Sequence, residues 1–233
     1  PVHHKVHAVT LRAESVERAG FETFMLKEIH EQPRVLRTLI EKHLDAGNQL
    51  VMKDLALPAE YFRKLNRIMI VACGTANHAG MYGKLLLENL TSIAVETDLG
   101  SEFRYRNPKI DPGTLIIAVS QSGETADTLA SVRMARSWGC KALSICNVPD
   151  SSLVRESDAV LFTEAGPEIG VASTKAYTAQ LMAFCLLAIA IGRARDEITA
   201  ELAAELLRDL QNIPDAIHYV LNRKDAIKAI ADK

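Results

Sequence analysis

The sequence lacks the bulk features that would assign it to nucleic acid or to a membrane. It has no excess of positive charge, because 27 Lys and Arg face 29 Asp and Glu for a net charge of -2. Long-range attraction to nucleic acid or to an anionic membrane surface is therefore not expected. The longest apolar run, Ala179 to Ile191, is shorter than the roughly 18 residues that a bilayer span needs. We expect this run to be a helix in the core.

Cysteine is scarce and carries no pairing signal. The chain has four cysteines and no CxxC motif, and three of the four stand in apolar runs, where a free thiol behaves as a small apolar side chain. We expect reduced thiols in a cytoplasmic protein. The four residues are Cys73, Cys140, Cys146 and Cys185.

The beginning of the chain has no periodic pattern. His3, His4 and His7 could bind a metal ion, but a histidine run near a chain end is more typical of solvated side chains, and no metal site is predicted. Proline stands at position 1 in place of an initiator methionine. This predicts a segment of a longer protein.

From residue 67 short β-rich runs alternate with helical segments. Five such strands, each separated from the next by a helix, predict a parallel sheet with helices on both faces. The fold class is therefore a doubly wound α/β domain, for which we expect the strand order 2-1-3-4-5. The five runs are IMIVA, SIAVETDL, TLIIAVS, ALSICN and AVLF.

Helices are expected on both sides of this domain. Residues 14–47 show two stretches of helical apolar spacing, and Pro33 between them predicts two amphipathic helices. They could pack on their own domain or connect it to another, and the sequence leaves both open. Helical spacing also runs to Ile213, and a second helix is predicted after Pro214. The predicted division is 1–55 as linker and helical extension, 56–195 as the α/β domain, and 196–233 as helices leading to a further domain.

The loop after the third strand, SQSGET, combines three hydroxyls, an amide and a glycine at the start of a helix. A helix N-terminus offers free N–H groups and a partial positive charge, which suit a phosphate without any lysine. Ser120, Gln121, Ser122 and Thr125 would donate hydrogen bonds, and Gly123 would let the backbone approach closely. Ser122 or Thr125 could instead be a simple N-cap. Because one cap needs one hydroxyl, we interpret the loop as a phosphate cradle.

Two other loops fall at the same edge of the sheet. In CGTANHAG, after the first strand, Gly74 and Gly80 do not form a GxGxxG dinucleotide motif, and a Walker lysine is also missing. NAD binding is therefore not expected, and P-loop chemistry is excluded. In the strand order 2-1-3-4-5 this loop flanks the same crevice as SQSGET. In EIGVASTKAYT, Ser173 and Thr174 could cap the long helix or reach a sugar hydroxyl.

Four motifs in order carry a family resemblance. The chain resembles the isomerase (SIS) region of glucosamine-6-phosphate synthases, the isomerizing glutamine:fructose-6-phosphate aminotransferases. The resemblance implies a cytoplasmic homodimer with an N-terminal glutaminase domain and two SIS halves, which needs no metal or redox cofactor. The chain would correspond to the linker and the first SIS half. The motifs are FMLKEIHEQP, SEFRYR, SQSGETADT and EIGVASTKAYT.

The resemblance also implies ligand roles. Fructose 6-phosphate or glucosamine 6-phosphate would be held at its phosphate by the SQSGET loop and at its sugar by Thr75, Val171 and Ser173. The family's usual CGTS reads CGTA here, so Ala76, which is also a predicted sugar-binding position, supplies no hydroxyl.

No catalytic residue is predicted in this chain. The resemblance implies that the acid, the base and the lysine of the isomerase, and the cysteine of the glutaminase, belong to parts outside it. His78, Glu124 and Lys175 are ionisable groups near the predicted site, and none is assigned catalysis. We therefore expect a chain that binds sugar phosphate without turning it over.

Two alternative functions stay open. One is a phosphosugar-sensing regulator of transcription, although residues 14–47 show no basic recognition helix. The other is a stand-alone sugar isomerase or deglycase built from two SIS halves.

Overall fold

The computed structural model describes residues 17–52 and 55–233, so the predicted His3, His4 and His7 lie outside the described residues. A five-stranded parallel sheet forms the centre of the molecule, in the order β2-β1-β3-β4-β5. The predicted fold class and strand order are confirmed. The strands are β1 (Arg67–Ala72), β2 (Ala94–Leu99), β3 (Leu115–Ser120), β4 (Lys141–Cys146) and β5 (Ala159–Phe162).

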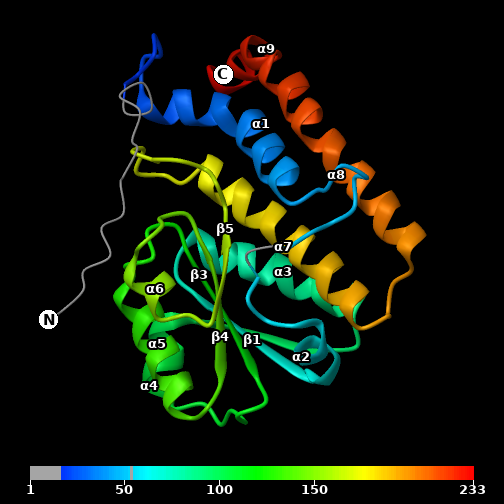
Figure 1. Ribbon diagram of the computed structural model, residues 1–233. Helices are drawn as coiled ribbons and strands as arrows, with labels where there is room; N and C mark the ends of the chain where they lie inside the picture. Colours follow the sequence, from blue (N-terminus) through cyan, green and yellow to red (C-terminus); the bar gives the residue numbers. More distant parts are fainter. Residues whose placement is uncertain (1–16, 53–54) are drawn as a thin grey trace, which may run out of the picture.

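Helices cover both faces of the sheet (Figure 1). Alternate strand residues point to opposite faces, so Ile68 and Ile70 join one apolar cluster while Met69 and Val71 join the other. The first cluster includes residues of α2 (Ala59–Lys64), α3 (Thr75–Leu90) and α7 (Lys175–Ala194). The second cluster includes residues of α4 (Gly100–Arg106), α5 (Ala126–Ser137) and α6 (Ser152–Arg155).

Helix α7 is the core helix that the apolar run predicts. In the described part of the chain it is the one helix long and apolar enough to cross a membrane, but 72% of that apolar window is buried inside the molecule. Ala179, Ala183 and Leu187 are completely buried within it. The predicted core helix is confirmed.

The N-terminal helix differs from the prediction. α1 runs without a break from Phe24 to Lys42 and contains Pro33 in its interior, so the two helices predicted on either side of Pro33 are wrong. A proline takes one backbone donor from a helix and leaves the carbonyl four residues earlier without its usual partner. Here the side chain of Gln32 donates to that carbonyl, on Ile29, at 3.0 Å. Gln32 thus offsets the loss.

Helix α1 packs on its own domain. Val35, Leu36, Leu39 and Ile40 are at most 2% exposed and belong to the same apolar cluster as α7. Figure 1 shows α1 lying between α7 and α8 (Ala200–Leu221). Of the two alternatives for this segment, packing on the domain is the one that the described residues adopt.

The C-terminal helices also differ from the prediction. α8 continues through a buried Pro214 to Leu221, and the next helix is α9 (Lys224–Ala231). The prediction of a helix that starts directly after Pro214 is therefore wrong. Apolar packing holds α8 on both sides of the proline, since Leu207 before it and Ile217 after it both pack in the cluster that contains Leu36 of α1. Tertiary contacts here outweigh the local cost of proline.

Candidate functional site

A cavity of about 220 Å³ lies at the carboxyl edge of the sheet, where β1 and β3 end side by side. In an open parallel sheet this is the point where ligands bind, because the strand order reverses there. The structure brings together eight of the nine predicted site residues, and their ligand roles stay predictions. These eight are Thr75, Ala76, Ser120, Gln121, Ser122, Thr125, Val171 and Ser173. Five further residues complete the lining: Cys73, Val119, Glu168, Gly170 and Gln180.

The loop of residues 121–125, here the β3–α5 loop, is shaped by its own hydrogen bonds. The Oγ atom of Ser120 accepts from the N–H of Gly123 at 3.0 Å and lies 3.2 Å from the Oγ1 atom of Thr125. Ser122 Oγ accepts from the N–H of Glu124 at 3.2 Å. Thr125 is the N-cap residue of α5, yet its side chain makes no capping bond within the described chain. The simple N-cap alternative therefore does not explain these hydroxyls.

Gly123 is the ninth predicted residue, and it stands outside the cavity lining. Its φ is +66°, and a Cβ atom there would lie 2.1 Å from the Oγ atom of Ser151. Glycine is needed at this position because of that close packing and the left-handed backbone. In the described structure the residue shapes the loop, and a role in contacting a ligand stays a prediction.

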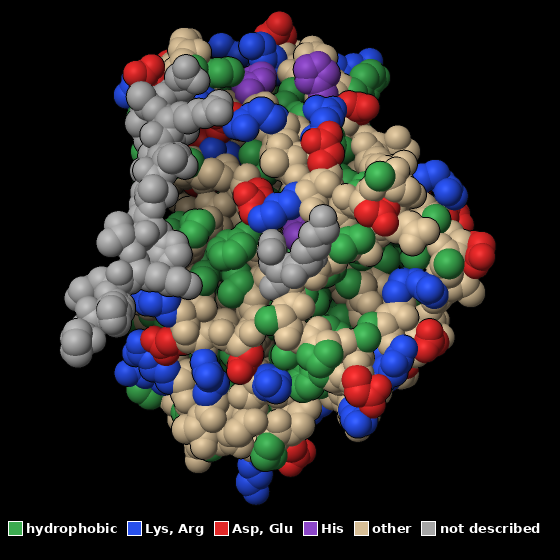
Figure 2. All heavy atoms as spheres, in the orientation of Figure 1, with side chains coloured by type: hydrophobic (Ala, Val, Ile, Leu, Met, Phe, Trp, Pro, Cys, Tyr) green, Lys and Arg blue, Asp and Glu red, His purple; other side chains and the backbone are tan. Residues whose placement is uncertain are grey.

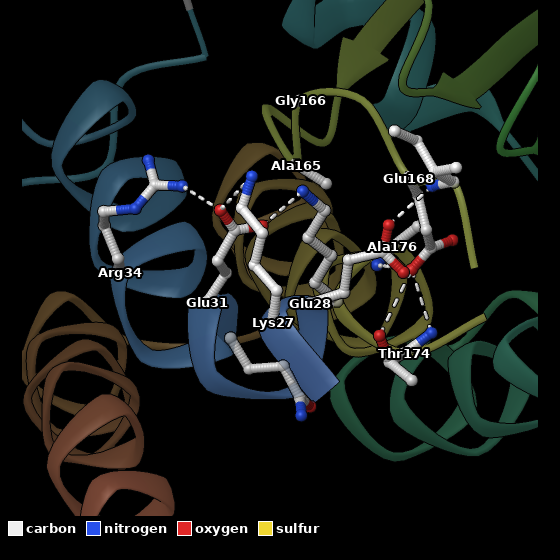
Figure 3. A network of polar contacts seen from close by, with 12 residues as sticks. Lys27, Glu28, Glu31, Arg34, Ala165, Gly166, Glu168, Thr174 and Ala176 are labelled. Atoms are coloured by element: carbon white, nitrogen blue, oxygen red, sulfur yellow. Dashed lines mark hydrogen bonds and ion pairs between the residues drawn. The ribbon is translucent and has the colours of Figure 1, made fainter. Parts of the chain in front are cut away.

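The N-terminus of α7 is already satisfied by a carboxylate. Glu168 accepts from the backbone N–H groups of Thr174 at 2.9 Å and Ala176 at 3.1 Å (Figure 3). It also accepts from the Oγ atom of Ser173 at 2.9 Å. A negative side chain complements the partial positive charge of a helix N-terminus. An added anion therefore has no open place at α7, whereas at the start of α5 the side chain of the N-cap residue, Thr125, makes no capping bond to the described residues.

A buried glutamate from α1 holds the segment of residues 163–174, here the β5–α7 segment. Glu28 is 2% exposed and accepts from the N–H groups of Ile169 at 2.5 Å and Gly170 at 3.1 Å. Gly170 itself lines the cavity. One wall of the cavity is thus supported from the N-terminal helix.

Lys175 is also bound to α1. Its side chain is 3% exposed, and its Nζ atom lies 2.6 Å from the Oε2 atom of Glu31. Glu31 lies 3.4 Å from Arg34 as well (Figure 3). Removal of one partner of a buried ion pair strongly destabilises a folded protein. We therefore interpret Lys175 as a residue that anchors α7 to α1.

The other two ionisable residues considered also lie away from the cavity lining. Glu124 accepts from the N–H of Ser152 at 2.7 Å, and this hydrogen bond holds the pKa of Glu124 below its ordinary value. His78 is exposed on α3. Neither residue lines the cavity, nor does Lys175.

The site has no cation of its own. Of the described residues that line the cavity, none is Lys or Arg, and Glu168 is the one carboxylate. Acidic and basic side chains are interspersed over the face drawn in Figure 2 and do not gather by sign. An anion in this cavity would be held by hydroxyls, an amide and backbone N–H groups at short range.

The cysteines play no visible part in this arrangement beyond packing. All four are free, as expected, and burial raises the pKa of the Cys146 and Cys185 thiols. Cys73 lines the cavity beside the end of β1. Raised thiol pKa values keep Cys146 and Cys185 protonated and unreactive near neutral pH.

The sheet order and the hydroxyl-rich cavity at its switch point define an α/β domain that suits a small polar ligand. The chain belongs to the SIS domain family, whose model matches residues 61–190. The predicted family is thereby confirmed.

The chain is similar over its whole length to particular SIS proteins. It is 49% identical to the isomerizing glutamine–fructose-6-phosphate aminotransferase of Symbiobacterium thermophilum and 46% identical to that of Methanosarcina acetivorans. In both comparisons the match covers 100% of this chain and 38% of the relative. The chain therefore spans little more than a third of the length of these curated relatives.

A solved structure supports the same relationship. The C-terminal domain of glucosamine-fructose-6-phosphate aminotransferase from Francisella tularensis matches with a TM-score of 0.88 at 39% identity. The match covers 92% of this chain and 60% of that chain.

Sequence reasoning missed two residues at this site. Glu28 stands in a helical segment 141 residues before Ile169, and no local pattern links the two. Gln180 is a 2% exposed residue of α7 that lines the cavity. Its one signal in the sequence is a polar residue at the start of the run AQLMAFCLLAIAI.

Proposed function

We propose that this chain is the first SIS half, with its preceding helix, of an isomerizing glutamine–fructose-6-phosphate aminotransferase. Its cavity would hold fructose 6-phosphate and the product glucosamine 6-phosphate. The observation that carries the proposal is the cavity between the ends of β1 and β3, lined by Ser120, Gln121, Ser122 and Thr125 and by no Lys or Arg among the described residues. The names of the relatives support the choice of ligand.

The phosphate would lie at the start of α5. Three helices, α3, α5 and α7, begin beside the cavity. Glu168 already occupies the N-terminus of α7, and of the other two helices α5 is the one preceded by the hydroxyls of Ser122 and Thr125. A dianion would be repelled by that carboxylate and attracted to the uncapped N-terminus of α5. The hydroxyls of Ser122 and Thr125 stand on that side and can donate to it.

The sugar would extend from there toward the loops after β1 and β5. Thr75 and Ala76 line that part of the cavity, together with Ser173 and a fully exposed Val171 at its rim. Because Ala76 has no hydroxyl, one hydrogen bond to the sugar is missing at this position. Either ligand affinity is lower for that reason, or a water molecule takes the place of the hydroxyl.

The remaining chemistry would belong to other parts of the whole protein. We propose that a second SIS half and an N-terminal glutaminase domain complete it, that it works in the cytoplasm as a homodimer, and that it needs no cofactor. The chain spans 38% of the relatives' length, which agrees with missing catalytic groups. The whole protein would transfer ammonia from glutamine to the sugar phosphate and isomerise the product.

The two alternative functions gain no support from the structure. A recognition helix must present an open basic face to DNA, whereas α1 packs against both α7 and α8, and its exposed Arg37 is paired with Asp215 of α8. A stand-alone isomerase or deglycase with two SIS halves would use the same cavity, and the length of the parent gene would distinguish it.

The test is a calorimetric titration of the purified chain with glucosamine 6-phosphate and with glucosamine. We expect heat from the phosphorylated sugar alone. The double variant Ser122→Ala with Thr125→Ala should weaken binding at least about 100-fold, because two hydrogen bonds to a charged group are lost. Ser137→Ala, at the other end of α5, is the matched control and should bind normally. Equal heats from both sugars would refute the phosphate cradle.

A second assay tests the division of labour. The purified chain, supplied with fructose 6-phosphate and glutamine, should form no glucosamine 6-phosphate. Turnover by the chain alone would refute the view that its catalytic groups lie elsewhere.

A further inference from the structure

Gln180 is a polar residue buried in an apolar helix, and it belongs to the wall of the cavity. The residue lines the cavity together with Thr75, Ala76 and Ser173 and is 2% exposed. The Oε1 atom of Gln180 has no hydrogen-bond partner among the residues that the structure describes. A buried carbonyl oxygen without a partner costs about 1–3 kcal/mol. An apolar side chain of similar size would avoid that cost.

Two of the hydroxyls around the cavity already have partners. Ser173 donates to Glu168, and Ser120 accepts from Gly123. Thr114 and Ser144 also bury hydroxyls without partners among the described residues, but neither lines the cavity. Gln180 therefore combines an unpaired acceptor with a place in the wall of a binding site, which is the arrangement expected where a ligand completes the hydrogen bonding.

We propose that the Gln180 side-chain carbonyl accepts a hydrogen bond from a hydroxyl or amino group on the carbon chain of the bound sugar phosphate. This inference rests on the proposed function and names a residue that selects the sugar part of the ligand. A phosphate dianion presents acceptor oxygens only, so it cannot satisfy a carbonyl. The partner must come from the sugar.

This geometry separates two kinds of recognition within one cavity. The β3–α5 loop would bind any phosphate monoester, whereas Gln180 would favour monoesters that carry hydrogen-bond donors. A ligand without donors would leave the carbonyl of Gln180 unpaired, as it is in the described structure, and would not gain this hydrogen bond.

The test uses Gln180→Met, which keeps the length of the side chain and removes the amide. The purified chain is titrated at pH 8 with glucosamine 6-phosphate and with methyl phosphate, a monoester that has no hydroxyl donor. We expect Gln180→Met to lower the affinity for glucosamine 6-phosphate about tenfold and to leave the affinity for methyl phosphate unchanged. The melting temperature without ligand should stay the same or rise, because an unpaired polar group is removed.

The matched control is Thr114→Val, which removes another buried hydroxyl without a partner in the described chain while keeping the side-chain shape. Thr114 precedes β3 at the end of the strand opposite to Ser120. The affinity of the Thr114→Val variant for both ligands should equal that of the unmodified chain.

Three results for Gln180→Met would overturn the inference. They are an unchanged affinity for glucosamine 6-phosphate, an equal loss for both ligands, and a lower melting temperature or unfolding without ligand. The second would mean that the amide faces the phosphate, and the third that the protein itself holds the amide.

A measurement on the unmodified chain gives an independent answer. Hexyl phosphate has a chain of six carbons without donors and should bind at least tenfold more weakly than glucosamine 6-phosphate, whereas equal binding would contradict the inference. Failure of both glucosamine 6-phosphate and methyl phosphate to bind would refute the proposed function, and the inference with it.

Discussion

The β3–α5 loop and the β5–α7 segment line the same cavity but are held in different ways. The first is shaped by bonds within the loop, as between Ser120 and Gly123, and by bonds to the segment that follows β4, where the N–H of Leu153 donates to the carbonyl of Gly123 at 3.0 Å. The second is held across the fold, since Glu28 on α1 accepts from Ile169 and Gly170. The N-terminal helix is therefore a structural support of the candidate site, in addition to its position as an extension of the domain.

The largest effect should come from breaking the local geometry of the β3–α5 loop. Gly123→Ala forces an L residue to a φ of +66° and places a Cβ atom 2.1 Å from Ser151 Oγ and 2.9 Å from Cys146 Sγ. We expect a loss of about 2–4 kcal/mol in the free energy of unfolding, from backbone strain and overlap together. Urea unfolding measures it.

Gly166→Ala is the matched control for this substitution. Gly166 has the same φ of +66°, but a Cβ atom there would meet nothing within 4 Å. The backbone cost alone, about 1 kcal/mol, should remain. Equal losses in the two variants would mean that the contact with Ser151 does not constrain the loop.

Removing the bond that ties the β5–α7 segment to α1 should lower stability less than Gly123→Ala does. It should also weaken ligand binding. Glu28→Ala leaves the N–H groups of Ile169 and Gly170 without their buried acceptor. We expect the free energy of unfolding to fall by about 1–3 kcal/mol. Affinity for glucosamine 6-phosphate should fall about fivefold, because a wall of the cavity loses its anchor. Calorimetry and urea unfolding measure the two quantities.

The control for Glu28 lies on the same helix. Glu41 is exposed on α1, so Glu41→Ala should change neither quantity measurably. If Glu28→Ala lowered stability but left ligand affinity intact, α1 would support the fold without supporting the site.

The same contrast explains what the sequence could predict. The sheet and its order follow from alternating short apolar runs, and SQSGET stands out because its chemistry is complete within six residues. The role of Glu28 could not be predicted, because its partners lie more than 140 residues away and are backbone groups. Gln180 was equally hidden, since only the folded cavity shows that its carbonyl lacks a partner.

Both errors in the helices have one physical cause. Proline is a strong local signal for a helix end, and the predictions at Pro33 and Pro214 relied on it. In the structure, Gln32 replaces a lost donor, and packing between α1 and α8 holds both helices through their prolines. Local propensity was overruled by tertiary contacts that a single sequence does not display.

The smallest effect concerns a contact of the β3–α5 loop that lies outside the cavity. The hydrogen bond from the N–H of Ser152 lowers the pKa of Glu124 below its ordinary 4.5. Because the pKa is lower in the folded state, the stabilisation is fully present above about pH 4.5 and is lost as the pH falls through the folded value. Glu124→Gln should therefore lower the melting temperature slightly at pH 7, and the difference should shrink toward pH 3. Ligand affinity should not change, unlike in Glu28→Ala, since Glu124 does not line the cavity. A difference in melting temperature that stayed constant down to pH 3 would show that the contact does not depend on the charge of Glu124.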